Sequence, residues 1–150
     1  MSQKSFVPKR RPEPVPGVHI LGMKITDEFQ VAKRIREGFA PTVVGRLAKE
    51  LNLSDKQLLQ LSDIPPSTFH ARKRSGKPLS PEYSSRLYRI AKATEAAEKY
   101  FEGNKNAARR WLASPKVALG GETPLAFAST PEGSDYVLKL LERMEHGVVS

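Results

Sequence analysis

The chain has 150 residues, no cysteine, 12 prolines and a formal net charge of +9. The length suits one domain or two small ones, and the lack of cysteine excludes disulfides, thiolate metal sites and a cysteine nucleophile. The composition, 39% apolar and 27% charged, is typical of a globular protein. Because the sequence has neither a run of about 18 apolar residues nor the apolar segment of a secretory signal near its start, we expect a cytoplasmic protein without a membrane partner.

The positive charge is concentrated in two segments. Residues 1–12 carry a net charge of +4 and residues 65–94 carry +6, whereas residues 13–64 are neutral and residues 95–150 have a net charge of −1. A basic segment followed by a slightly acidic half indicates two surfaces with different partners, a polyanion for one and a protein for the other. The alternative is that the clustered basic residues only solvate a helix face.

The first elements in chain order are an arm and two helices. Residues 1–22 contain four prolines and show no helical period, which predicts a flexible basic arm ending in a short extended piece at residues 18–21. Thr26 is expected to cap a first helix, whose apolar face would carry Phe29, Ala32 and Ile35. Pro41 is expected to begin a second helix at its first position.

Two short helices joined by a tight turn are predicted next. Ser54 and Gln57 form a capping-box pattern that opens the first, and the prolines at 65 and 66 require a turn before the second, which would span residues 67–75. This outline, with a basic second helix, is typical of a DNA-binding helix-turn-helix. Its small core would consist of Leu58, Leu61, Ile64 and Phe69.

The second of these helices is the predicted DNA-binding element. Hydroxyl and amide groups at its start can contact phosphates, and its arginines can pair with guanine in the major groove. The turn has Asp63 where such motifs usually have glycine, and aspartate tolerates the left-handed conformation better than most residues. The expected DNA-binding residues are Ser67, Thr68, His70, Arg72, Lys73, Arg74 and Lys77.

A long helix is predicted after the cap, proline and acid at residues 80–82. Its apolar residues recur at intervals of four and three, so they form either part of the core or a dimer face: Tyr83, Leu87, Ile90, Thr94, Ala97 and Phe101. Further short helices follow, capped by Asn104 and Thr130, and the last ends at Gly147. No repeated strand pattern occurs, so the predicted fold class is all-α.

No constellation of residues indicates catalysis. His19, His70 and His146 are far apart along the chain, and no metal-binding or nucleophile motif occurs. We therefore expect no enzyme, with neither catalytic residues nor a cofactor nor a metal. Trp111, a lone tryptophan on a helix, is expected to be a core residue rather than a site residue.

The C-terminal half carries a specific resemblance to a known family. Residues 106–115 (NAARRWLASP), 118–125 (ALGGETPL) and 133–148 (GSDYVLKLLERMEHGV) resemble the toxin-binding domain of the Xre/MbcA/ParS antitoxins. Residues 64–76 (IPPSTFHARKRSG) look like the Xre-type half of the same family, so the resemblance covers residues 26–150. It implies a type II antitoxin with an Xre/Cro-like helix-turn-helix domain at 23–102, which dimerises, and a small helical toxin-binding domain at 103–150.

The resemblance also implies the partners. The helix-turn-helix would bind operator DNA and repress the antitoxin's own operon as a homodimer. The C-terminal domain would silence a RES-type toxin, a protein similar to ADP-ribosyltransferases that depletes NAD, and its tail would reach into the toxin's NAD pocket. The expected toxin-binding residues are Arg143, Glu145, Gly147, Val148, Val149 and Ser150.

The tail residues themselves agree in part with this role. Val148 and Val149 can fill an apolar pocket, while Glu145 and the terminal carboxylate meet basic groups that otherwise hold pyrophosphate, and Arg143 pairs with an acid of the toxin. A frayed C-terminus without a function is the alternative.

Two other functions fit parts of the sequence. One is a stand-alone helix-turn-helix regulator whose C-terminal helices dimerise or sense a ligand. The other is a non-specific nucleic-acid binder that relies on the basic arm and the basic segment, and its affinity would fall steeply with salt and hardly vary with sequence.

Overall fold

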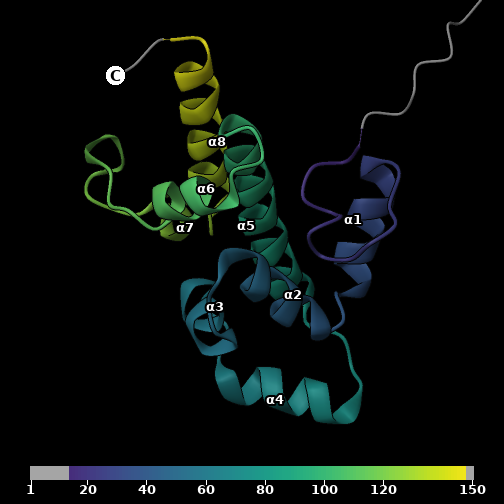
Figure 1. Ribbon diagram of the computed structural model, residues 1–150. Coiled ribbons are helices and arrows are strands. Elements are labelled where there is room, and N and C mark those ends of the chain that lie inside the picture. Colours follow the sequence, from purple (N-terminus) through teal and green to yellow (C-terminus); the bar gives the residue numbers. More distant parts are fainter. Residues whose placement is uncertain (1–13, 148–150) are drawn as a thin grey trace, which may run out of the picture.

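The computed structural model describes residues 14–147, and over this range every regular element is a helix (Figure 1). The predicted all-α fold is confirmed. The first part of the predicted arm and the predicted toxin-binding residues Val148, Val149 and Ser150 lie outside the described residues. The helices are α1 (Glu28–Glu37), α2 (Thr42–Leu51), α3 (Asp55–Leu61), α4 (Pro66–Ser75), α5 (Pro81–Tyr100), α6 (Lys105–Leu112), the 3₁₀-helix η1 (Val117–Leu119), α7 (Pro124–Phe127) and α8 (Pro131–Glu145).

The long helix α5 organises the fold. Its cap residue Ser80 accepts a hydrogen bond from the Tyr83 N–H, as its sequence predicts. The helix packs against α1, α2, α6, α7 and α8, and it runs through the middle of the molecule, with α4 below its first turns and α8 rising beside its far half (Figure 1). Because both halves of the chain pack on the same helix, they share one continuous hydrophobic core.

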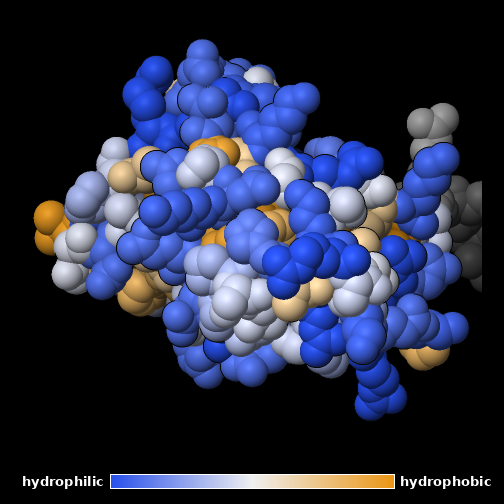
Figure 2. Space-filling view, turned by 90° about the horizontal axis from the view of Figure 1, so that it is seen from below, coloured by the Kyte–Doolittle hydropathy of each residue, from blue (hydrophilic) through white to orange (hydrophobic). Residues whose placement is uncertain are grey.

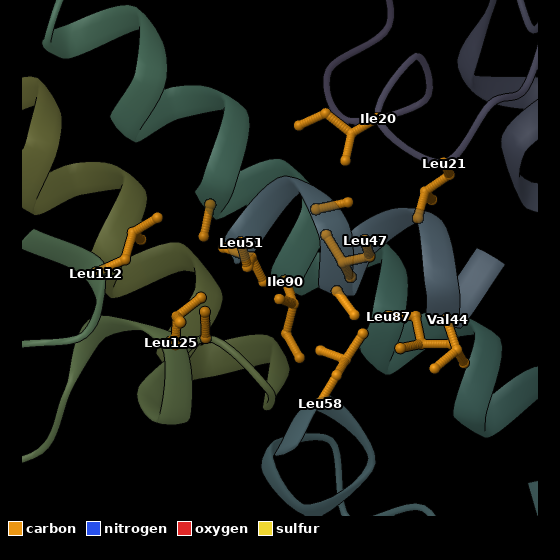
Figure 3. Packing of buried hydrophobic residues seen from close by; sticks show 14 of the residues in the cluster. Ile20, Leu21, Val44, Leu47, Leu51, Leu58, Leu87, Ile90, Leu112 and Leu125 are labelled. Carbon is orange, nitrogen blue, oxygen red and sulfur yellow. The ribbon is translucent and has the colours of Figure 1, made fainter. Parts of the chain in front are cut away.

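The apolar seam of α5 belongs to this core. Leu87, Ile90, Thr94 and Ala97 are all almost fully buried. Figure 3 shows Leu87 and Ile90 among Leu47 of α2, Leu58 of α3 and residues of the C-terminal helices. The seam therefore supplies no dimer face, because its central side chains are already covered within one chain. Truncation of a buried leucine or isoleucine to alanine typically costs about 2–5 kcal/mol.

The segment at residues 14–22 is not the extended end of an arm, so the prediction for this part of residues 1–22 is wrong. The apolar side chains of Val15, Val18, Ile20 and Leu21 are buried. The backbone turns rather than extends, since the Met23 N–H donates to the Val18 carbonyl at 3.0 Å. Burial of these side chains against α1 and α5 gives the segment a fixed conformation that its proline spacing did not reveal.

Helix α1 also differs from its prediction. Asp27, not Thr26, is the cap residue, and its carboxylate accepts the Gln30 N–H at 2.8 Å. The buried residue of this helix is Val31, whereas Phe29 is 78% exposed. Val31 packs with Val15, Val18 and Ile25 of the preceding segment. The N-terminal segment therefore decides which face of α1 is buried.

Two links between helices lie side by side and fix the position of α4. The Leu79 N–H donates to the Phe39 carbonyl at 2.8 Å, and the Phe39 N–H donates to the buried Ser84 hydroxyl at 2.8 Å. Gly38 has φ 92°, and a Cβ atom there would overlap the Leu79 carbonyl oxygen. Only glycine allows this approach, which joins the α1–α2 link to the α4–α5 link. Of the helices within the described range, none is both long and apolar enough to cross a membrane.

Candidate nucleic-acid interface and partner surface

Helices α3 and α4 form a helix-turn-helix unit as predicted. The Ser54 hydroxyl accepts the Gln57 N–H at 3.1 Å and the Gln57 side chain accepts the Ser54 N–H at 2.9 Å, which confirms the capping box. In the turn, Asp63 has φ 53°, the left-handed conformation expected for it. The buried Ile64 follows, and its N–H donates to the Leu59 carbonyl at 2.9 Å.

An arginine of α5 holds this turn in place. Arg86 donates to the carbonyls of Ser62 at 3.3 Å and Asp63 at 2.9 Å, and it forms a salt bridge with Glu82 at 2.6 Å. The bonded carbonyls lie just beyond the last turn of α3, where backbone acceptors lack partners within the helix. Arg86 therefore holds the turn that sets the angle between α3 and α4.

Helix α4 presents the predicted DNA-binding residues at one end of the molecule. Phe69 is buried and holds the helix on the core, while Thr68 and Arg72 are half-buried. Ser67, His70 and Arg74 are exposed and recur at intervals of three and four residues, so they share one face. The other exposed members of the predicted set are Lys73 and Lys77.

The charge of α4 is available to a partner. None of its three basic residues, nor Lys77, forms a salt bridge with another residue of the described range. Arg72, Lys73 and Arg74 lie in the last turn, where positive charge is favourable beside the helix dipole. Figure 2, which views the molecule from below in Figure 1 and thus from the side of α4, shows a surface dominated by hydrophilic residues. This face suits a polyanion.

Not every basic residue of the segment 65–94 contributes to this surface. Arg89 donates from two nitrogens to the Ser129 carbonyl at 3.0 and 2.8 Å and from a third to the Ser85 hydroxyl at 2.7 Å. Burial, together with the neighbouring charge of Arg86, lowers the pKa of Arg89. Both arginines are thus engaged within the chain, and the exposed basic residues of the segment, Lys73, Arg74 and Lys77, lie on α4 and the link after it.

A cluster of charged residues joins the two halves of the chain. The Lys105 ammonium lies 2.9 Å from a Glu50 carboxylate oxygen, and Arg109 donates to the Glu50 carbonyl at 2.8 Å. Glu98 of α5 shares a hydrogen bond with the Glu50 carboxyl group. Burial and the adjacent Glu50 raise the pKa of Glu98 to about 7. Burial also acts to raise the pKa of Glu50, but hydrogen bonds with Glu98 and Lys105 and the charges of Lys105 and Arg109 outweigh it and lower that pKa.

Capping hydrogen bonds and one close backbone contact fix the positions of the C-terminal helices. Asn104, Thr123 and Thr130 each accept an N–H at the start of α6, α7 and α8. A Cβ atom on the buried Gly133 would overlap the Phe127 carbonyl oxygen, so only glycine lets α8 start directly against the end of α7. The predicted stripe of α8 is buried at Val137, Leu140 and Leu141.

The predicted toxin-binding residues that the structure describes lie at the end of α8. Arg143 is half-buried with its guanidinium 5.7 Å from the centre of the Tyr136 ring, and Glu145 is exposed. Gly147, with φ 73°, follows the end of the helix. This end of α8 points away from α4 and lies at the opposite end of the molecule (Figure 1). The two predicted surfaces are therefore separate.

The loop between α6 and α7 presents a residue that the sequence did not single out. Val117 is 99% exposed, although the loop is braced by hydrogen bonds from the Lys116 N–H to the Glu122 carbonyl at 3.0 Å and from the Gly121 N–H to the Lys116 carbonyl at 2.9 Å. The only signal in the sequence was the pair of glycines at 120–121. Trp111, expected in the core, is half-buried and packs against it, with the Lys116 ammonium 5.2 Å from the centre of its ring. Within residues 14–147, no three His, Asp or Glu side chains are grouped so that they could hold a metal ion.

Comparison with known proteins assigns each half of the chain to a described domain. Residues 30–92 match the family model of the antitoxin Xre-like helix-turn-helix domain, and residues 96–147 match that of the antitoxin Xre/MbcA/ParS C-terminal toxin-binding domain. The chain is 32% identical to a protein named Antitoxin Xre from Pseudomonas putida, over 83% of this chain and 76% of the relative. It is 29% identical to Antitoxin Xre from Yersinia enterocolitica, over 87% and 88% of the two chains. It is 27% identical to the Prs ADP-ribosylating antitoxin from a Sphingobium species, over 75% and 76%.

Proposed function

This chain belongs to the Xre/MbcA/ParS antitoxin family, and from that premise we propose that it inhibits a RES-type toxin through its C-terminal half and represses its own operon through α4. The observation that carries the proposal is the separation of two unlike surfaces at opposite ends of α5 (Figure 1). The exposed basic helix at one end suits DNA, and the other end falls within the half that matches the toxin-binding domain.

The proposal for the toxin concerns the end of α8. A relative named for ADP-ribosylation supports a partner with NAD chemistry. We propose that residues 148–150 enter the toxin's NAD pocket, with Val148 and Val149 in its apolar part and the carboxylate and Glu145 on groups that otherwise bind pyrophosphate. Arg143 pairs with an acid of the toxin, and Gly147, with φ 73°, ends the helix before the tail. Inhibition then works by occupation of the pocket, and the antitoxin requires neither catalysis nor a cofactor of its own.

In the proposed DNA complex, the two ends of α4 have different tasks. Ser67, Thr68 and His70, at its N-terminal end, face bases and phosphates, as in other helix-turn-helix proteins. Arg72, Lys73, Arg74 and Lys77 supply the charge that holds the phosphate backbone. We propose a cytoplasmic homodimer that places two copies of α4 on half-sites about 34 Å apart. Since the α5 seam is buried, the dimer uses another surface.

One experiment tests the toxin half of the proposal. A variant that lacks residues 148–150 should bind the purified RES-type toxin but fail to prevent NAD consumption, because the tail fills the pocket while the remaining C-terminal half makes the other contacts. Arg74→Ala is the matched control, since it changes the opposite end of the molecule: it should inhibit the toxin like the unmodified protein and bind operator DNA more weakly. Full inhibition by the truncated variant would refute the tail mechanism. Absence of any complex with the toxin would favour a stand-alone regulator instead.

A further inference from the structure

An open hollow of about 510 Å³ lies between the C-terminal ends of α1 and α4. Three cationic side chains line it: Arg34 from α1, Lys73 from α4 and Lys77 from the link after α4. The acidic residue in its lining is Glu37. The hollow therefore combines positive charge from two helices that are separated by some 40 residues of sequence, and it adjoins the DNA-binding residues of α4.

The backbone beneath the hollow is fixed. The hydrogen bond from Leu79 to the Phe39 carbonyl and the close approach of Gly38 to Leu79 join the two links that form its floor. The Lys77 N–H donates to the Arg72 carbonyl at 3.0 Å, and this bond joins the link to the last turn of α4. Arg34 and Lys77 are thus presented on one rigid support, so a ligand that meets both does not have to order the backbone first.

The charges at the hollow are not neutralised within the described range. Arg34, Lys73 and Lys77 form no salt bridge with any residue in 14–147, and both Arg34 and Lys77 are exposed. With Glu37 counted, the side chains of the hollow have a net charge of +2. A shallow, open, cationic site of this kind suits a chain of phosphates rather than an enclosed small anion.

Its position relative to α4 indicates which phosphates it meets. When the N-terminal residues of a recognition helix contact base edges, its C-terminal end leaves the groove over the adjacent backbone. We propose, on the basis of the proposed DNA-binding function, that the α1–α4 hollow is a second phosphate-binding site, in which Arg34 and Lys77 hold the DNA backbone beside the base pairs that α4 contacts. This role extends the DNA-binding surface to α1, which lies outside the α3–α4 pair.

The test measures how the affinity of the full-length protein depends on salt. The probe is a fluorescently labelled 30-base-pair duplex from immediately upstream of the gene, and anisotropy gives Kd between 50 and 300 mM KCl. Loss of one phosphate contact reduces the slope of log K against log[salt] by about 0.9, so Arg34→Ala should show that reduction together with a several-fold weaker Kd. Glu37→Gln should bind more tightly, because it removes the negative charge at the site.

Arg36→Ala is the matched control. Arg36 is an exposed arginine on the same helix, but it does not line the hollow, and its removal changes the net charge equally. It should leave the slope within about 0.3 of the unmodified protein, since no phosphate contact is lost. Equal effects of Arg34→Ala and Arg36→Ala, or an unchanged slope for Arg34→Ala in a variant that melts like the unmodified protein, would overturn the proposal.

Further comparisons distinguish a failure of the second phosphate site from a failure of DNA binding itself. If Arg74→Ala weakens binding and Arg34→Ala does not, the second phosphate site is wrong while DNA binding by α4 stands. If the unmodified protein does not bind the duplex at all, the proposed DNA-binding function itself fails. Replacement of chloride by inorganic phosphate at constant ionic strength should leave Kd unchanged, and strong competition by millimolar phosphate would indicate a site for the free ion and overturn the assignment to the DNA backbone.

Discussion

Replacement of Glu98 by glutamine should stabilise the protein above neutral pH. Glu98 and Glu50 share a hydrogen bond where α5 meets α2, and the cations nearest to the pair, Lys105 and Arg109, both contact Glu50. Burial and the adjacent carboxylate raise the pKa of Glu98 from 4.5 to about 7. When Glu98 loses its proton, two carboxylates face each other without a hydrogen between them. Glutamine keeps an N–H donor for Glu50 and never ionises.

The sign of the pH dependence follows from proton binding. In the unfolded chain the Glu98 carboxyl group loses its proton near its ordinary pKa, whereas in the folded protein it retains it up to about pH 7. Between these values the folded state binds more protons, so the free energy of unfolding falls as the pH rises through this window. A rise in pKa from 4.5 to about 7 has an upper limit of about 3.4 kcal/mol. Because Glu98 is only partly buried, screening by solvent reduces this to on the order of 1–2 kcal/mol.

Urea denaturation followed by helical circular dichroism, at fixed protein concentration between pH 5.5 and 8.5, measures the effect. Because only about 1.5 of the 2.5 pH units between the two pKa values lie within this range, the unmodified protein should lose on the order of 1 kcal/mol across it. Glu98→Gln should be nearly flat and more stable at pH 8. Glu50 does not obscure the result, because its lowered pKa places its own contribution below this window. Parallel pH profiles for the two proteins, or a glutamine variant less stable at pH 8, would show that the carboxyl pair does not titrate as described.

Two further predictions concern backbone conformation. Gly133→Ala should destabilise the protein by about 1–3 kcal/mol, because the added Cβ overlaps the Phe127 carbonyl. Gly45→Ala, on the exposed face of α2, should stabilise the protein by about 0.5–1 kcal/mol, because alanine favours the helix over glycine. Thermal melts that rank the two variants the other way would contradict this account. Asp63→Ala should lower the free energy of unfolding by about 1 kcal/mol, because alanine at φ 53° lacks the local polar contacts that aspartate makes in the left-handed region. Asp63→Gly should not lower it, because glycine adopts this conformation without strain. Equal denaturation midpoints for the two variants would contradict this prediction.

The features that the sequence predicted well are those that depend on neighbouring residues. The caps at Ser54 and Ser80 and the left-handed Asp63 follow from side chains acting on backbone groups within three or four positions. The face of α1 could not be predicted in this way. Phe29 and Val31 are both apolar, and only the folded segment at residues 15–25 determines that Val31 is the buried one.

For the candidate DNA surface, too, some features follow from the sequence and others only from the fold. The charge of the segment 65–94 includes the exposed basic residues of α4, yet Arg86 and Arg89 belong to the same segment and are used inside the molecule. Conversely, Arg34 comes from a segment with no net charge and lines the same hollow as Lys77. Charge summed along the chain can identify neither the internal arginines nor the contribution of Arg34, because both depend on which distant residues the fold brings together.

The shared core has a consequence for how the two surfaces act. Arg86 holds the turn before α4, and Arg89, less than one turn further along α5, holds the Ser129 carbonyl just before α8. Both ends of the molecule are therefore fixed to one central helix rather than joined by a linker. A partner bound only at the C-terminal end of α8 leaves α4 uncovered, because the two lie at opposite ends (Figure 1). The geometry thus permits one antitoxin chain to hold a toxin and contact DNA at the same time.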